Sequence, residues 1–239
     1  MKLLALDTST EACSVALQLG ADILSLDEVC PQQHSKRVLP MVQQLLSQAG
    51  VALKDLDGIV FGRGPGSFTG VRIGVGVAQG LAFGAELPLY GVSTLAAMAQ
   101  AAQRLHGADK VVAAIDARMA EVYLGCYQLD ADGLMQLLGA EIARKPLDLV
   151  AADIPPGFVA AQVSGTAPVF GVGTGFQTYA EALTAWQPVQ ISPQILFPSA
   201  QDMLALSQAA FAKGLFVAPE LAEPTYVRDE VTWQKLPGR

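Results

Sequence analysis

The sequence predicts an α/β protein in which two related halves form two lobes, each a mixed sheet with helices, around a cleft. Strand and helix patterns alternate along the 239 residues, as is typical of this fold class. Residues 4–7 match residues 113–116, and residues 60–66 match residues 169–175 at the same offset, with five of seven residues identical in the second pair. Two matches at one offset indicate an internal duplication.

The first half is expected to open with strands and to continue with helices. Apolar runs bounded by polar turns predict strands, at residues 2–6, 13–19, 23–29 and 56–61. Apolar residues at helical spacing predict helices, at residues 37–49, at 69–83, and after Ser93 or Thr94, either of which can cap the helix. Because Pro40 is tolerated only in a first helical turn, the earliest helix is expected to begin near Lys36 or Arg37.

The second half repeats this pattern. Strands are expected at residues 111–115, 121–128 and 168–171, and helices at 177–186 and from Ser199 to Gly214. Ser199 and Asp202 have the spacing of a capping box. We therefore expect a first lobe at 1–105, completed by the helix at 199–214, a second lobe at 106–198, and a tail at 219–239 without clear periodicity. Residues 145–165 give no clear pattern.

Composition and charge limit the function. The net charge is −7, with 15 Lys and Arg in total and no dense cluster of them. Because nucleic-acid affinity depends on such residues, a partner is expected to hold any nucleic acid on which the chain acts. No apolar run reaches the length of about 20 residues that spans a bilayer, and three scattered cysteines fit a reducing compartment. We expect a cytoplasmic protein.

The helix at 69–83 carries an unusual number of glycines, and each costs about 1 kcal/mol relative to Ala in a helix interior. Gly76, Gly80 and Gly84 share one face, and Gly70 with Gly74 form a second pair. The glycines serve either close packing on the protein's own sheet or a flat face for another helix, and the two can hold together. Other residues of the expected partner surface are His34, Arg37, Met41 and Arg72.

Two turns are candidates for a nucleotide site. Asp7, Ser9 and Thr10 can hold a hydrated Mg²⁺ and a phosphate, or they form a turn whose side chains bond their own backbone. Glycines at a helix N-terminus can approach a phosphate, and the second turn carries three, Gly171, Gly173 and Gly175. No Walker lysine or Rossmann acid follows, so both functions stay open.

A third turn carries Asp116 and Arg118. One interpretation is that these polar groups serve catalysis. The alternative is a structural hairpin turn in which Arg118 pairs with a carboxylate such as Glu121. We favour the structural interpretation.

The predicted arrangement resembles the actin-like ATPase (ASKHA) fold, and four motifs resemble the TsaB family, also called YeaZ, over essentially the whole chain. The residues concerned are Asp7-Thr8-Ser9-Thr10, the glycine run at 62–74, Asp116-Ala117-Arg118 with Glu121 and Tyr123, and Pro224-Thr225-Tyr226-Val227-Arg228. The glycine run is the most specific of the four.

This resemblance implies a subunit of the bacterial complex that makes N6-threonylcarbamoyladenosine at position 37 of tRNAs reading ANN codons. It further implies pairing with a catalytic paralogue, TsaD, through helices of the first lobe, recruitment of a small ATPase, TsaE, and a functional link to TsaC, which supplies the activated threonylcarbamoyl group. The tRNA is expected to lie mainly on TsaD. Alone, the chain is expected to form a homodimer.

The resemblance does not carry catalysis over to this chain. The paralogue's family uses an HxxxH metal pair, whereas Thr94 and Met98 stand at the matching positions here, and a hydroxyl with a thioether does not make a hard-metal site. The chain contains only His34 and His106, which also opposes a metallopeptidase. We expect no enzyme activity, no metal and no required cofactor, with ATP or ADP and magnesium possible in the cleft or at the partner interface. The alternative is an actin-like small-molecule kinase or ATPase.

Overall fold

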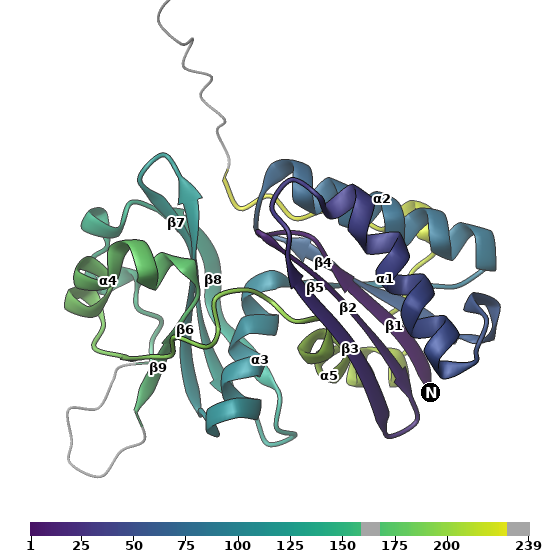
Figure 1. The fold of residues 1–239 in the computed structure, drawn as a ribbon. Helices are drawn as coiled ribbons and strands as arrows, with labels where there is room; N and C mark the ends of the chain where they lie inside the picture. Colours follow the sequence, from purple (N-terminus) through teal and green to yellow (C-terminus); the bar gives the residue numbers. More distant parts are fainter. Residues whose placement is uncertain (159–167, 229–239) are drawn as a thin grey trace, which may run out of the picture.

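A computed structural model describes residues 1–158 and 168–228 and shows two lobes side by side (Figure 1). The sheet of the first lobe has five strands in the order β3 (Asp22–Val29), β2 (Ala12–Leu19), β1 (Lys2–Asp7), β4 (Gly58–Gly64) and β5 (Leu89–Ser93). The sheet of the second lobe has the order β8 (Met135–Arg144), β7 (Glu121–Leu129), β6 (Lys110–Arg118), β9 (Val169–Val172) and β10 (Gln190–Ile191).

The two sheets have the same topology. In each, the first three strands form an antiparallel meander, and the fourth and fifth strands add in parallel beyond the first. The strand β1 of the first lobe therefore corresponds to β6 of the second. The duplication and the mixed α/β fold predicted from the sequence are confirmed.

Five helices cover the sheets among the described residues: α1 (His34–Ala49), α2 (Phe68–Ala85), α3 (Thr94–His106), α4 (Thr174–Trp186) and α5 (Ala200–Ala212). The strand β1 is buried on both faces. Leu4 and Leu6 pack against α1 and α2, whereas Leu3 and Ala5 pack against α5. Such two-sided burial explains the unbroken apolar run of this strand.

The helix α3 contributes to both lobes. Ala97 joins the core under the first sheet, and Leu95 and Met98 join the core of the second sheet. A helix between two cores needs small or apolar residues all round, which accounts for its alanine-rich sequence. The helix α4 covers the remaining face of the second sheet with Phe176 and Leu183. None of the helices in the described parts of the chain is both long and apolar enough to cross a bilayer.

The predicted start of α1 is wrong. The helix begins at His34, so Pro40 lies in its second turn. Pro40 and Lys36 are both exposed, so the backbone bond that proline cannot make is lost on the solvent side, where water can replace it. The predicted end is confirmed, since Gly50 takes the left-handed conformation with φ 66°.

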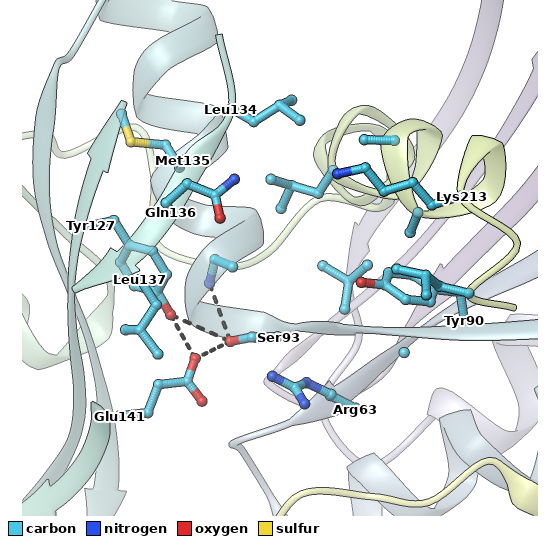
Figure 2. Close-up of a pocket in the computed structure, with 17 residues that line it drawn as sticks. Arg63, Tyr90, Ser93, Tyr127, Leu134, Met135, Gln136, Leu137, Glu141 and Lys213 are labelled. Atoms are coloured by element: carbon cyan, nitrogen blue, oxygen red, sulfur yellow. Dashed lines mark hydrogen bonds between the residues drawn. The ribbon is translucent and has the colours of Figure 1, made fainter. Parts of the chain in front are cut away.

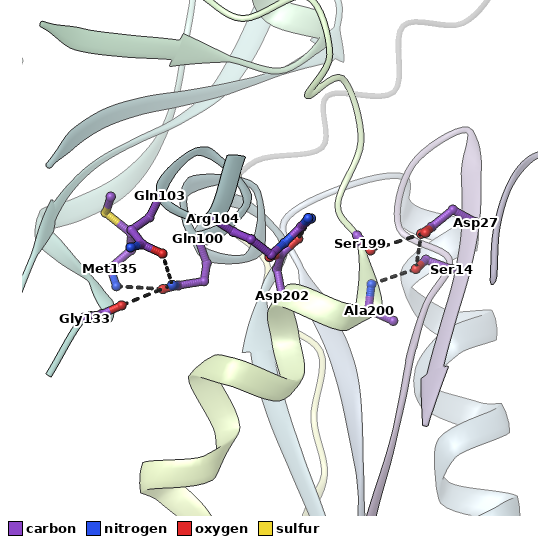
Figure 3. Close-up of polar contacts among 10 residues, drawn as sticks. All are labelled: Ser14, Asp27, Gln100, Gln103, Arg104, Gly133, Met135, Ser199, Ala200 and Asp202. Carbon is purple, nitrogen blue, oxygen red and sulfur yellow. Dashed lines mark hydrogen bonds and ion pairs between the residues drawn. The ribbon is translucent and has the colours of Figure 1, made fainter. Parts of the chain in front are cut away.

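The predicted capping box of α5 is also wrong. Ser199 stands at the N-cap but makes no capping bond with its side chain. Asp202 instead forms an ion pair with Arg104 of α3, with Nε–Oδ1 at 2.8 Å and Nη2–Oδ2 at 2.9 Å (Figure 3). The carboxylate is only 1% exposed, and a buried charge requires a charged partner more than a helix end requires a cap. Ser14 of β2 accepts the Ala200 N–H instead, at 2.6 Å.

Short 3₁₀ helices occupy part of the segment that gave no sequence pattern, at Pro146–Asp148 and Ala151–Asp153; others lie at Leu53–Asp55 and Pro219–Leu221. The indole N–H of Trp186 on α4 donates to the carbonyl of Val150 at 2.9 Å, which fixes the segment to the second lobe. Of the predicted tail, residues 229–239 lie outside the described part of the chain.

Candidate functional site

The structure brings the β1–β2 turn and the β6–β7 turn together at the mouth of the cleft. Arg118 Nη2 lies 3.0 Å from Glu11 Oε1, and this ion pair joins the lobes across the gap. Beside it is a cavity of about 400 Å³, lined from both lobes by residues that include Ser9, Thr10, His34, Asp116 and Arg118. Two of the three candidate turns, those of Ser9 and Asp116, thus face one space, whereas the turn at Gly171, Gly173 and Gly175 does not line it.

The side chain of Asp7 does not line this cavity. Its side chain is 1% exposed, and a methyl group added at Gly62 would overlap with its carboxylate. The N–H and the hydroxyl of Ser9 both donate to Oδ1 at 2.8 Å. Burial raises the pKa of Asp7 to about 6 despite these bonds. The carboxylate is enclosed by its own turn and by β4, so it is not placed to hold a hydrated cation in this conformation.

The glycines of the second candidate turn are explained by packing within the chain. Gly173 has φ 104°, and a Cβ at this position would overlap with the carbonyl oxygen of Ala114. A Cβ at Gly175 would lie 2.8 Å from the Ala114 side chain, and one at Gly171 would lie 2.7 Å from Val189. All three glycines let the turn lie directly on its own neighbours, and a role in binding nucleotide stays a prediction.

Arg118 pairs with a carboxylate, as the structural interpretation of this turn predicts, but that carboxylate is Glu11 and not Glu121. Three successive residues, Arg118, Met119 and Ala120, have positive φ, and Arg118 pairs with Glu11 of the other lobe. Glu121 instead pairs with Arg228, with Nη2–Oε2 at 2.6 Å. Asp116 accepts the Arg118 N–H at 2.9 Å, which stabilises the turn itself. The Arg118 side chain, through its pair with Glu11, joins the two lobes.

The tail has a role that its sequence, without clear periodicity, does not predict. The N–H of Thr225 donates to the carbonyl of Arg63 at 2.7 Å, and Arg228 Nη2 donates to the carbonyl of Ala117 at 3.1 Å. We call residues 219–228 the strap, because they run from α2 of the first lobe to the β6–β7 turn of the second (Figure 1). The motif Pro224–Arg228 lies within the strap and is the signal in the sequence from which the strap could have been expected.

The glycines of α2 divide into two groups. Gly70 and Gly74 are buried, and a Cβ atom added at either position would meet Thr8. Gly76, Gly80 and Gly84 are exposed, and apart from the helix's own backbone and the adjacent residues, no atom of the described residues lies within 4 Å of a Cβ added at any of them. The exposed glycines form a bare strip on the outer surface.

Two exposed apolar side chains belong to the same pair of helices. Phe83 of α2 lies at helical spacing from Gly76 and Gly80 and is 78% exposed, and Leu39 of α1, which lines a pocket together with Leu81 of α2, is 47% exposed. We call the three exposed glycines together with Leu39 and Phe83 the α1–α2 surface. An exposed apolar patch of this kind is typical of an interaction site.

The other residues predicted for the partner surface lie in different settings. His34 and Met41 are buried, at 8% and 3% exposure, and the Nε2 atom of His34 has no hydrogen-bond partner among the described residues. Arg37 is exposed and pairs with Glu28 at 2.6 Å. The guanidinium of Arg72 lies 3.3 Å from the ring centroid of Phe68. Only the exposed residues can meet a partner without rearrangement of the chain.

The helix α3 carries two residues at the positions where the paralogue's family has histidines. Thr94 is fully buried, and its hydroxyl lies 3.0 Å from the hydroxyl of Ser9. Met98 is fully buried beside Gly173. Within residues 1–158 and 168–228, no group of three potential ligands of the types His, Cys, Asp and Glu is placed to hold a metal ion.

Comparison with known proteins relates this geometry to a family. The model of the TsaD family, described as tRNA N6-adenosine threonylcarbamoyltransferase, matches residues 26–235. The chain is 48% identical to the tRNA threonylcarbamoyladenosine biosynthesis protein TsaB of Escherichia coli (strain K12) over all of both chains. It is 43% identical to the protein of the same name from Haemophilus influenzae, over 100% of this chain and 98% of the relative.

A solved structure shows the same fold. YeaZ from Pseudomonas aeruginosa is 48% identical and superposes with a TM-score of 0.81, covering 94% of this chain and 99% of that chain. The likeness therefore includes both lobes and the cleft between them. This chain belongs to the TsaB (YeaZ) family.

Proposed function

We propose that this chain is a non-catalytic subunit required for N6-threonylcarbamoylation of adenosine 37 in tRNAs that read ANN codons. Its full-length relatives are named as tRNA threonylcarbamoyladenosine biosynthesis proteins. The observation that carries the proposal is the bare strip of α2. Each glycine lowers the stability of the helix. At Gly76, Gly80 and Gly84 this cost is not explained by close packing, because a Cβ there would meet no described atom outside the helix. A surface that lacks side chains serves the close approach of another helix.

The partner proposed for the α1–α2 surface is the paralogue TsaD, and a second copy of this chain occupies the same surface when TsaD is absent. The pair then helps to form the binding site of the ATPase TsaE, and TsaC supplies the activated group. The net charge of −7 favours tRNA contact mainly through TsaD. The site of action is the cytoplasm.

Two features support the absence of bond-making chemistry in this subunit. Thr94 and Met98 offer a hydroxyl and a thioether, and both are enclosed by packed side chains. Asp7 is also enclosed, so the first turn does not fit a magnesium ion. The chain is proposed to need no cofactor, and the interface with the partner is a better place than the cleft for any ATP or ADP with magnesium.

An omission assay tests the proposal directly. Purified tRNA, threonine, bicarbonate and ATP are incubated with TsaC, TsaD and TsaE, with and without this chain, and the modified adenosine is measured. We expect modification only when the chain is present, and neither ATP hydrolysis nor tRNA modification by the chain alone. Equal modification without it would overturn the proposal.

The substitution Gly80→Arg tests the partner surface. Because a Cβ at Gly80 meets no described atom outside its own helix, the monomer is expected to fold with an unchanged circular dichroism spectrum, while homodimer formation and TsaD binding are lost in sedimentation experiments. Gln208→Arg adds the same charge on an exposed position of α5 and is expected to leave both unchanged. Normal pairing of the Gly80→Arg chain would show that α2 is not the interface.

The second candidate function is an actin-like small-molecule kinase or ATPase. It is favoured by the cleft cavity of about 400 Å³ with Ser9, Thr10 and Asp116 on its walls. In that case the isolated chain hydrolyses ATP with magnesium, and Asp116→Asn abolishes the hydrolysis. A purified chain without any hydrolysis excludes this function.

A further inference from the structure

A second cavity lies between the lobes, and it shares no lining residue with the cavity at the Arg118 turn. Its volume is about 400 Å³. It lies between β5, the edge strand of the first sheet, and β8, the edge strand of the second, and α5 closes one side (Figure 2). We call it the edge-strand cavity.

A polar cluster forms one wall of the edge-strand cavity. The hydroxyl of Tyr127 donates to Oε1 of Glu141 at 2.6 Å, and the hydroxyl of Ser93 donates to the same oxygen. Burial raises the pKa of the Tyr127 phenol well above its ordinary value, so this group remains a donor at neutral pH. Ser93 also accepts the Ala96 N–H at 3.2 Å and thereby caps α3. The carboxylate of Glu141 is held in place by both lobes.

An irregularity of β8 places Glu141 in this wall. The pairing between β7 and β8 shifts register, because Leu124 pairs with Ile142 whereas Cys126 pairs with Leu138. Gly139, inside the shifted segment, has φ 75°, a value that favours glycine. Bulges of this kind redirect side chains and are frequent next to functional sites.

Two cationic side chains, Arg63 and Lys213, also line this cavity. The guanidinium of Arg63 points toward Ser93 and Glu141, and the ammonium of Lys213, the residue that follows α5, points into the cavity (Figure 2). Neither side chain takes part in an ion pair with any residue that the structure describes. Nε of Arg63 is buried without a hydrogen-bond partner among those residues, although buried donors are normally satisfied. Two positive charges against one negative charge leave the cavity suited to an anion.

The rest of the wall combines the polar side chain of Gln136 with apolar groups (Figure 2). The apolar part includes Leu137 of β8, Leu206 and Ala210 of α5, and Leu215 and Tyr90. An inorganic anion would leave these side chains without a contact. A ligand with one anionic group and a hydrocarbon part matches both halves of the lining.

We propose that the edge-strand cavity binds a small organic carboxylate, with its carboxylate group between Arg63 and Lys213 and its hydrocarbon part against Leu206 and Leu215. This site does not depend on the function proposed above and can be tested on the isolated chain. Because its walls come from both lobes, a bound ligand stabilises one arrangement of the lobes.

The test uses hexanoate as the probe and hexylamine as a ligand of the same shape and opposite charge. We expect hexanoate to shift the backbone amide signals of Ser93, Leu137 and Lys213 in NMR titrations, acetate to bind more weakly, and hexylamine to shift none of them. Hexanoate that leaves these signals unchanged, or that is matched by hexylamine or acetate, would overturn the proposal.

Variants assign the carboxylate position. Arg63→Met and Lys213→Met are each expected to weaken hexanoate binding about tenfold or more, since each removes a charged partner. Lys36→Met removes an equal charge from exposed α1 and is expected to bind as the parent does. Glu141→Gln keeps an acceptor for Ser93 and Tyr127 but removes a like charge, so hexanoate is expected to bind more tightly.

Circular dichroism shows whether each variant is folded. Should Arg63→Met fail to fold, Lys213→Met decides the question, because the Lys213 side chain is exposed. Unchanged affinity in a folded variant of either residue would refute the proposed position of the carboxylate.

Discussion

The two halves of this chain use the same strand, glycine turn and helix, but only the first half extends its glycines along the helix. The matching glycines at 62, 64 and 66 and at 171, 173 and 175 mostly lie where a Cβ would meet neighbouring atoms of the chain. Gly76, Gly80 and Gly84 of α2 have no such contact, and the sequence of α4 carries only Gly175. The glycines shared by the halves serve the fold, as do the unshared Gly70 and Gly74, which pack on Thr8. Only the unshared glycines that are exposed indicate a surface for a partner.

The largest effect is expected where a shared glycine becomes alanine. Gly173→Ala forces a side chain into a conformation that only glycine adopts readily and into the carbonyl of Ala114, so we expect a loss of about 3 kcal/mol or more in the free energy of unfolding. Gly133→Ala is the control, because φ is also positive but nothing lies within 4 Å. Urea denaturation measures both, and equal losses would show that backbone conformation alone explains Gly173.

The second effect concerns the carboxylates of the two matching turns. Burial raises the pKa of Asp7 to about 6 from an ordinary 3.8, so the folded chain binds this proton more tightly than the unfolded chain. The contribution of Asp7 to the free energy of unfolding is therefore greatest below about pH 4 and falls by about 2–3 kcal/mol as the pH rises to about 6. Above this range it is constant.

Asp7→Asn is expected to remove that pH dependence and to be more stable than the parent chain at about pH 8. Denaturation curves at a series of pH values measure it, and Asp116→Asn controls for the loss of a carboxylate from the matching turn. A variant that keeps the parent's slope between about pH 4 and pH 6 would contradict the assignment to Asp7.

A smaller effect is expected at the strap, for which the second half has no counterpart among the described residues. Arg228 is partly buried and contacts Glu121 and the carbonyl of Ala117. Arg228→Met should lower the free energy of unfolding by about 1–2 kcal/mol and increase hydrogen exchange in the β6–β7 turn. Arg118→Met removes the exposed pair with Glu11, which is expected to contribute at most about 1 kcal/mol. A greater loss from Arg118→Met would mean that the Arg118–Glu11 pair contributes more to stability than the contacts of the strap.

The smallest effect has the opposite sign. Gly80→Ala is expected to raise the free energy of unfolding of the monomer by about 0.5–1 kcal/mol, because alanine is the better helix former and meets no neighbour here. Gly74→Ala places a Cβ 2.8 Å from the Thr8 hydroxyl and is expected to destabilise instead. If both substitutions changed the free energy of unfolding in the same direction, α2 would not have one packed and one bare face.

Much of the fold could be predicted because its signals are local. Apolar alternation, helical spacing and the Gly50 and Gly107 stops identify most elements of the first lobe. The start of α1 was missed because the rule for Pro40 describes an average helix and does not include the exposure of the lost bond. The capping box of α5 was missed because Arg104, which binds Asp202, is 98 positions away in the sequence.

The candidate sites were predictable only in outline. The sequence marked the turns at Asp7, Asp116 and Gly173 and the glycines of α2, since rare residue types in repeated positions are visible without coordinates. It did not show that Asp7 faces β4, that His34 and Met41 are buried, or that Arg118 crosses the cleft. The direction of a side chain depends on the packing of neighbours distant in sequence.

Residue order alone was enough to establish the duplication, the α/β class, the acidic charge and the family motifs, because each follows from local periodicity, composition or internal matching. Three-dimensional packing was needed to decide which glycines are buried and which are bare, and to bring Arg63, Glu141 and Lys213 to one cavity. Such contacts join residues from both lobes. The local sequence pattern determines the helices and strands. The free energy of packing between them determines whether a side chain lies in the core, in the cleft or on the surface.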